Sequence, residues 1–211
     1  KKFFSETFWA KQYEDMDKLE KIMEKMLSLL DEWNFVKVEG KKDKKPDFIS
    51  ASEIINKSYN HENLLLKPTL IGKRISELYL DPLTAKHILN CIESYHKLNE
   101  ENKKTFSLLQ MISHTLEMRP LLRIKSKEQD KIQEKLIENY DYLLEQEPSA
   151  FDLEYNEFMN SIKTTLFFES WINEKDEDYL LEKYDIRPGE IRMKIESADW
   201  LLYAAEELSK I

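Results

Sequence analysis

Glycine and cysteine are both scarce in this chain of 211 residues. The three glycines are Gly40, Gly72 and Gly189, and so few flexible positions predict a mainly α fold with little hairpin content. Cys91 is the single cysteine, which excludes an internal disulfide and fits a reducing, intracellular setting.

Long apolar runs and an excess of positive charge are missing too. No stretch approaches the ~18 apolar residues of a membrane span, and the first residues lack the apolar core of a signal peptide, so we expect a cytoplasmic protein without a membrane partner. The net charge is −9, and it arises in residues 85–211, where 17 basic residues face 26 acidic ones. Residues 1–84 hold 15 of each. This acidity argues against unspecific nucleic-acid binding but allows a groove with its own basic residues.

Motifs for catalysis and for metal binding are not found. The stretch "IGKRIS" lacks the upstream glycine of a phosphate-binding loop, so Gly72 is expected to permit close packing or a tight bend. His87 and Cys91 have the spacing of two zinc ligands, but no second pair completes the site. We therefore expect Cys91 in the core with His87 at its edge, and no catalytic residue, metal or cofactor in this chain.

Hydrophobic periodicity divides the chain into two predicted domains, 1–83 and 84–211. In the first, residues 11–33 have helical spacing, "NFVKVEG" and "NLLLKPT" are typical of strands, and a polar insertion at 41–63 separates them. This order resembles the later half of a winged-helix domain without its first elements. The tip between the strands is either a phosphate contact or a solvated hairpin. Its basic residues are Lys41, Lys42, Lys44 and Lys45.

From Thr84 onward the pattern changes to successive amphipathic helices. Apolar stripes recur at helical spacing. Four helix starts are predicted, at a capping box of Ser126 and Gln129, at Ser149 and Asp152, at Asn173 and Asp176, and at Pro188. Each stripe needs a partner that buries it. The sequence therefore predicts a bundle of about six helices.

The helix that begins at Pro188 places a large aromatic side chain, Trp200, away from its apolar stripe. At ~100° per residue Trp200 lies roughly 160° from the middle of that stripe. The predicted stripe consists of Ile191, Ile195, Ala198, Leu202 and Ala205. The Trp200 side is shared by Met193, Ser197, Tyr203 and Ala204 and flanked by Arg192 and Lys194, while Arg187 precedes the helix.

Two interpretations of Trp200 remain open at this point. An aromatic ring between cations is typical of single-stranded nucleic-acid binding, in which bases stack on the ring and cations contact phosphates. The first turn of the helix adds a possible phosphate site. Alternatively, the helix is central and covered on both faces, so that Trp200 belongs to the core.

Several long segments, in the same order, resemble archaeal Ski-two-like DNA helicases of superfamily two, which are relatives of the helicase half of DNA polymerase theta. The segments include "TLIGKRISELYLDPLTAKHI", "ISHTLEMRPLLRI" and "ESWINEKDEDYLLEKYDIRPGEIRMKIESADWLLYAAEELSKI". The resemblance implies a partial winged-helix domain followed by a multi-helix ratchet bundle that is Sec-sixty-three-like.

The resemblance also implies an ATP-dependent 3′–5′ helicase that acts at stalled replication forks. Its ATP and magnesium would bind two RecA-like motor domains that are missing here, so this chain alone is expected to be inactive. The implied partners are single-stranded or forked DNA and the protein's own motor domains, and we expect a monomer.

In this family a tryptophan on the ratchet helix and a basic residue seven positions earlier contact bases. Trp200 matches the tryptophan, but Met193 occupies the basic position, which leaves Arg192 or Lys194 as the substitute. The alternative is a structural or protein-interaction bundle with no direct nucleic-acid contact, as in related spliceosomal and translocon proteins. It predicts that Trp200 is buried and that a partner binds elsewhere, for example along the acidic stretch 174–185.

Overall fold

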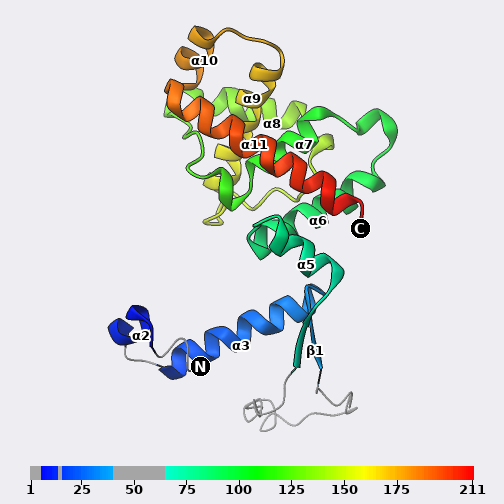
Figure 1. The fold of residues 1–211 in the computed structure, drawn as a ribbon. Coiled ribbons are helices and arrows are strands. Elements are labelled where there is room, and N and C mark those ends of the chain that lie inside the picture. Colours follow the sequence, from blue (N-terminus) through cyan, green and yellow to red (C-terminus); the bar gives the residue numbers. More distant parts are fainter. Residues whose placement is uncertain (1–5, 14–15, 40–64) are drawn as a thin grey trace. The chain divides into compact units, whose positions relative to one another are not determined.

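The computed structural model describes residues 6–13, 16–39 and 65–211 (Figure 1). The predicted lysine tip, Lys41, Lys42, Lys44 and Lys45, and the 41–63 insertion lie outside these ranges. The chain divides into two compact units, Lys1–Glu77 and Leu78–Ile211, so the boundary falls six residues before the predicted one at 83. Leu78 and Leu80 are both buried and belong to the second unit. The predicted mainly α fold is confirmed, because helices account for most of the described residues.

The first unit contains a two-stranded antiparallel sheet next to helices. Its helices are α2 (Phe8–Tyr13), α3 (Met16–Glu32) and α5 (Leu70–Glu77), and its strands are β1 (Val36–Glu39) and β2 (Leu65–Pro68). Val36 pairs with Pro68 and Glu39 with Leu65. Both predicted strands are confirmed.

A tight junction joins α5 to the residues before β1. The Thr69 hydroxyl donates to the Asn34 carbonyl at 2.7 Å and accepts the Gly72 amide N–H at 3.0 Å. A Cβ atom on Gly72 would lie 1.8 Å from the Phe35 carbonyl oxygen. Only glycine therefore fits at position 72, which confirms the prediction that Gly72 permits close packing.

The second unit, in which every residue is described, contains six α-helices, with short 3₁₀ turns in the connections between α6 and α9. They are α6 (Pro82–Lys97), α7 (Thr105–Ser113), α8 (Gln129–Glu138), α9 (Tyr155–Ile172), α10 (Glu177–Tyr184) and α11 (Pro188–Ser209). Helix α9 packs against α7, α8 and α10, and α11 crosses α6 and α7 (Figure 1). This arrangement agrees with the predicted bundle of about six helices. No helix among the described residues has both the length and the apolar character needed to cross a membrane.

Two of the four predicted helix starts are confirmed, and the start predicted at Ser149 and Asp152 is wrong because α9 begins at Tyr155. Asp176 caps α10, with its carboxylate accepting the Tyr179 amide N–H at 2.7 Å, and Pro188 is the first residue of α11. The capping box predicted at Ser126 is wrong, because residues 126–128 form a 3₁₀ turn before α8. There the Lys125 amide N–H donates to the Glu128 carboxylate at 2.8 Å instead.

Candidate nucleic-acid interface

Helix α11 buries a different stripe from the predicted one. Leu202, expected in the core, is 36% exposed, whereas Ala204, expected beside Trp200, is fully buried. The buried stripe is therefore turned by roughly 70° about the helix axis, at ~100° per residue. It consists of Ile191, Lys194, Ala198, Leu201, Ala204, Ala205 and Leu208. A lysine in this stripe explains why apolar periodicity alone misplaced it.

Trp200 lies at the margin of the buried stripe. It is partly buried, and its indole N–H donates to the Leu78 carbonyl oxygen at 3.2 Å. Both residues belong to the second unit. The side chain is thus neither fully exposed nor sealed in the core, and its polar edge is fixed while part of its surface meets solvent.

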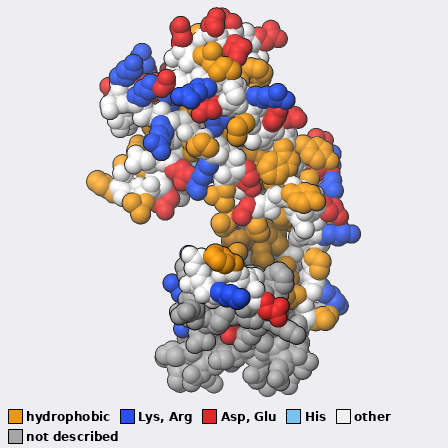
Figure 2. All heavy atoms as spheres, turned by 60° about the vertical axis from the view of Figure 1, so that its left-hand side comes forward, with side chains coloured by type: hydrophobic (Ala, Val, Ile, Leu, Met, Phe, Trp, Pro, Cys, Tyr) orange, Lys and Arg blue, Asp and Glu red, His pale blue; other side chains and the backbone are white. Residues whose placement is uncertain are grey.

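Exposed apolar and aromatic side chains lie on the Trp200 side of α11 and directly after Leu78 in the chain. Met193 is 66% and Tyr203 53% exposed, and both share the Trp200 side of α11. Tyr79, which directly follows Leu78, is 87% exposed and has a positive φ of 58°. On the face drawn in Figure 2, hydrophobic side chains form patches among the charged ones. Exposed rings of this kind can stack on nucleobases.

The predicted cations of α11 do not gather around Trp200. Arg192 is exposed, and its Nε lies 2.8 Å from the Glu196 carboxylate on the same helix. Arg187 is exposed at the start of the helix, where its backbone N–H donates to the Glu190 carboxylate at 2.8 Å. Neither arginine therefore supplies the basic contact that the resemblance implies at the position of Met193.

Lys194 departs most from the prediction. It is only 8% exposed, and its ammonium donates to the Pro120 carbonyl at 2.6 Å and the Met118 carbonyl at 3.2 Å. Burial lowers the pKa of Lys194 below its usual value, although Glu190 acts in the opposite direction. Its charge stabilises backbone carbonyls, so in this structure Lys194 does not flank the Trp200 face.

A groove of about 830 Å³ lies beside the first half of α11. One wall includes Met193, Lys194 and Ser197 of α11, and the other is the segment 117–125. Trp200 follows Ser197 by three residues on the same side of the helix, so it lies about one turn beyond the groove.

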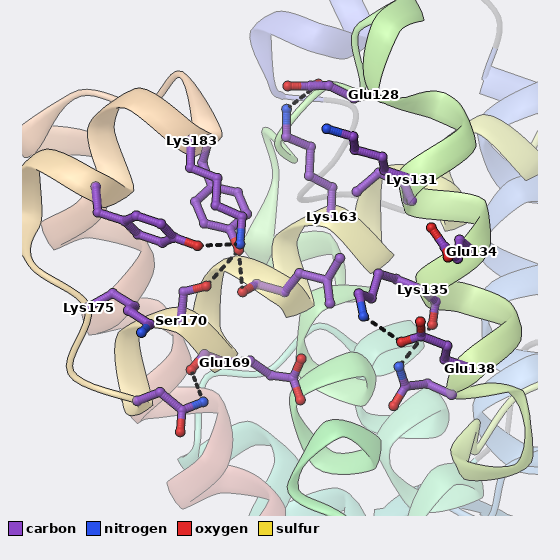
Figure 3. Close-up of a pocket in the computed structure, with 16 residues that line it drawn as sticks. Glu128, Lys131, Glu134, Lys135, Glu138, Lys163, Glu169, Ser170, Lys175 and Lys183 are labelled. Carbon is purple, nitrogen blue, oxygen red and sulfur yellow. Dashed lines mark hydrogen bonds and ion pairs between the residues drawn. The ribbon is translucent and has the colours of Figure 1, made fainter.

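A second hollow, of about 890 Å³, lies between α8, α9 and α10 (Figure 3). Two ion pairs join charges that line it: Lys163 pairs with Glu128 at 2.8 Å, and Lys135 with Glu138 at 2.5 Å. Burial raises the pKa of Glu169, against the influence of nearby lysines. Because five lysines face four glutamates across this hollow, it offers no strong surplus of either charge.

The His87 and Cys91 pair belongs to a buried polar cluster. Cys91 is 1% exposed, and burial, together with the charge of Glu145, raises the pKa of its thiol; its expected place in the core is confirmed. The Nε2 atom of His87 lies 2.9 Å from the Met111 carbonyl, and Nδ1 of His114 lies 2.8 Å from Glu145. Among the described residues, no three His, Cys, Asp or Glu side chains converge as metal ligands.

Residues 106–211 match the family described as archaeal helicase, domain 4. A protein named ATP-dependent DNA helicase Hel308 from Methanococcus vannielii is 38% identical over 152 residues, which is 71% of this chain and 19% of that protein. The protein of the same name from Methanocaldococcus jannaschii is 33% identical over 209 residues, or 99% of this chain and 14% of the relative. The chain thus spans less than a fifth of the length of these two relatives.

Proposed function

Because this chain belongs to the archaeal helicase domain 4 family, we propose that it is the C-terminal part of an ATP-dependent 3′–5′ DNA helicase that acts at stalled forks. Helix α11 contacts the translocating single strand. ATP and magnesium bind the RecA-like motor domains of the complete protein, and this chain alone hydrolyses no ATP. The relatives' shared name, ATP-dependent DNA helicase, supports the assignment.

The partly exposed ring of Trp200 is the observation that carries this proposal. Its N–H edge is held by Leu78, and Met193 and Tyr203 extend the exposed surface along the same side of α11. A base that stacks on such a ring gains about 1–3 kcal/mol. This is enough to favour one position of the strand over the positions between two steps.

The mechanism that follows is a stack-and-release cycle. The motor domains move the strand during each ATP cycle, and the stack on Trp200 resists slipping in the reverse direction. The side chain takes no part in ATP chemistry. Its loss should therefore affect coupling between ATP hydrolysis and unwinding, and leave hydrolysis itself unchanged.

The test is Trp200→Ala in the complete helicase, with Trp171→Ala as the matched control. Trp171 is also a helix tryptophan and is 42% exposed, but it lies on α9. We expect Trp200→Ala to weaken single-strand binding about 5- to 150-fold, since 1–3 kcal/mol is lost, and to reduce unwinding. ATP hydrolysis without DNA should match the wild type. Normal unwinding by Trp200→Ala would overturn the proposal.

A protein-interaction role is the second candidate, and one feature favours it. Phe151 and Leu153, in the turn before α9, are 99% and 92% exposed, and paired apolar side chains of this kind are typical of protein contacts. This role predicts that Phe151→Ser abolishes capture of a partner protein while Trp200→Ala does not. The acidic stretch 174–185, exposed over residues 174–179, is the other surface to compare.

A further inference from the structure

Two buried lysines hold the groove-lining segment 117–125 in place. Lys194 of α11 donates to the carbonyls of Met118 and Pro120. Lys163 of α9, only 2% exposed, donates to the Arg123 carbonyl at 2.9 Å. The backbone of the wall that faces α11 is therefore hydrogen-bonded to two helices of the core. This fixes the positions from which its side chains project.

Residues 122–124 of this segment alternate between buried and exposed side chains. The Leu122 amide N–H donates to the Thr164 hydroxyl at 3.2 Å, and that of Ile124 donates to the Asn160 side-chain oxygen at 2.9 Å. Leu122 is buried and Ile124 partly buried, while Arg123 between them is exposed. Successive side chains of an extended chain point to opposite sides, so Arg123 points away from α9.

Most charges along the groove already have partners. Lys125 pairs with Asp185 at 2.6 Å, and Arg119 pairs with Glu157. The Glu117 carboxylate accepts a hydrogen bond from the Thr84 hydroxyl at 2.5 Å. Within the described ranges, the structure gives Arg123 no ion pair, although it is exposed and lines the groove.

The opposite wall contributes no available cation. Met193 holds the family's basic position, and the Lys194 ammonium is bound to two carbonyls. Arg192 is paired with Glu196 and, at ~100° per residue, lies on the other side of Trp200 from Ser197. The cation that a phosphate in the groove would contact therefore lies on the wall formed by residues 117–125.

We infer that Arg123 binds a backbone phosphate of the single strand whose base stacks on Trp200. This inference rests on the proposed function and adds the residue that replaces the missing basic contact of α11. A guanidinium suits the role because its parallel N–H groups can bind two phosphate oxygens at once. The contact is independent of sequence, as the binding of a translocating strand requires.

The test measures binding of an oligothymidylate to the complete helicase by fluorescence anisotropy over a series of salt concentrations. Loss of one phosphate contact reduces the slope of log Kd against log salt by about 0.7 for a single strand. We expect Arg123→Ala to show this reduction and to bind about three- to tenfold more weakly near 0.1 M salt. Arg123→Lys should retain the slope, because the charge remains.

Two control variants separate this contact from stacking. Trp200→Ala should weaken binding without changing the slope, because stacking releases no counterion. Arg192→Ala should leave both affinity and slope unchanged. All variants alter exposed or partly exposed side chains, and unchanged thermal midpoints would show that each remains folded.

The outcomes distinguish the two proposals. If Arg123→Ala has the wild-type slope and affinity while Trp200→Ala binds weakly, the phosphate contact is refuted and the proposed function stands. If the wild type does not bind the oligothymidylate, or Trp200→Ala binds normally, the strand does not use this helix and both proposals fail.

Discussion

At the scale of single residues, the buried lysines decide how α11 sits on the bundle. A lysine has an apolar stem that packs in a core while its ammonium reaches a polar partner. Lys194 does this with the carbonyls of Met118 and Pro120. The groove near Trp200 therefore depends on Lys194, although lysine is a residue type that is usually exposed to solvent.

We predict that Lys194→Met lowers the free energy of unfolding by about 1–3 kcal/mol, because two carbonyls lose their donor while the side-chain volume is nearly kept. Lys210→Met is the matched control, since Lys210 is 55% exposed and its partners are on its own helix. That control should change stability by less than about 0.5 kcal/mol. Urea unfolding of both variants measures the difference, and equal losses would contradict a structural role for Lys194.

The sequence could place Trp200 away from the main apolar stripe, but not Lys194 within the buried one. Periodicity assigns residues by type, and nothing in the local pattern distinguishes a lysine that reaches a carbonyl from one in water. The partner carbonyls at Met118 and Pro120 are about 75 residues away in sequence. For the same reason Arg123 could not be selected, since the backbone around it is held by a hydrogen bond from Lys163 and by bonds to Thr164 and Asn160.

At the scale of secondary-structure elements, α5 and the residue before β1 approach so closely that no side chain fits at position 72. The Thr69 hydroxyl, the Phe35 carbonyl and the amide of Gly72 meet within hydrogen-bonding distance. The sequence signals this only through a lone glycine inside a helical pattern. Such a glycine usually has a packing reason, which the structure supplies.

We predict that Gly72→Ala destabilises the first unit by about 1–3 kcal/mol or more, because the new methyl group would collide with the backbone at Phe35. Gly189→Ala tests the same substitution in open space, since a Cβ atom there has no neighbour within 4 Å. It should leave stability unchanged or raise it by up to about 1 kcal/mol. Thermal unfolding followed by circular dichroism compares the two, and a tolerated Gly72→Ala would show that the junction can move apart.

At the scale of the whole molecule, each unit has its own packing. A core cluster of the second unit joins α7, α8 and α9, so it needs nothing before residue 78. Its buried members are Phe106, Ile132, Leu136, Phe158, Met159 and Ile162. Composition and stripe spacing predicted this helical bundle well, because each amphipathic helix must bury one face.

The boundary at 77 was harder to predict than the bundle itself. Pro82 and the change of pattern at Thr84 suggested a later division. Leu78 and Leu80 extend the second unit and lie in a short run of sequence. The unit to which this run belongs depends on distant partners such as Trp200. Local sequence does not contain that information.

We predict that residues 78–211 fold when produced alone. The isolated piece should have a helical circular dichroism spectrum and a single cooperative urea transition, with a midpoint near that of the same unit in the longer chain. Residues 1–77 produced alone are the comparison, since their core is smaller. A spectrum without a cooperative transition for 78–211 would mean that its stability requires the first unit.

The hydrogen bond from Trp200 to Leu78 affects the timing of any event at the ring. Because the indole N–H is already hydrogen-bonded in the folded protein, the side chain has lost part of its rotational freedom before a nucleotide arrives. In the strand contact proposed above, residence of a base on this surface would depend on the nucleotide's own motion and would require no slow rearrangement of the protein. A translocating enzyme that must release its strand at every step would benefit from such a pre-oriented contact.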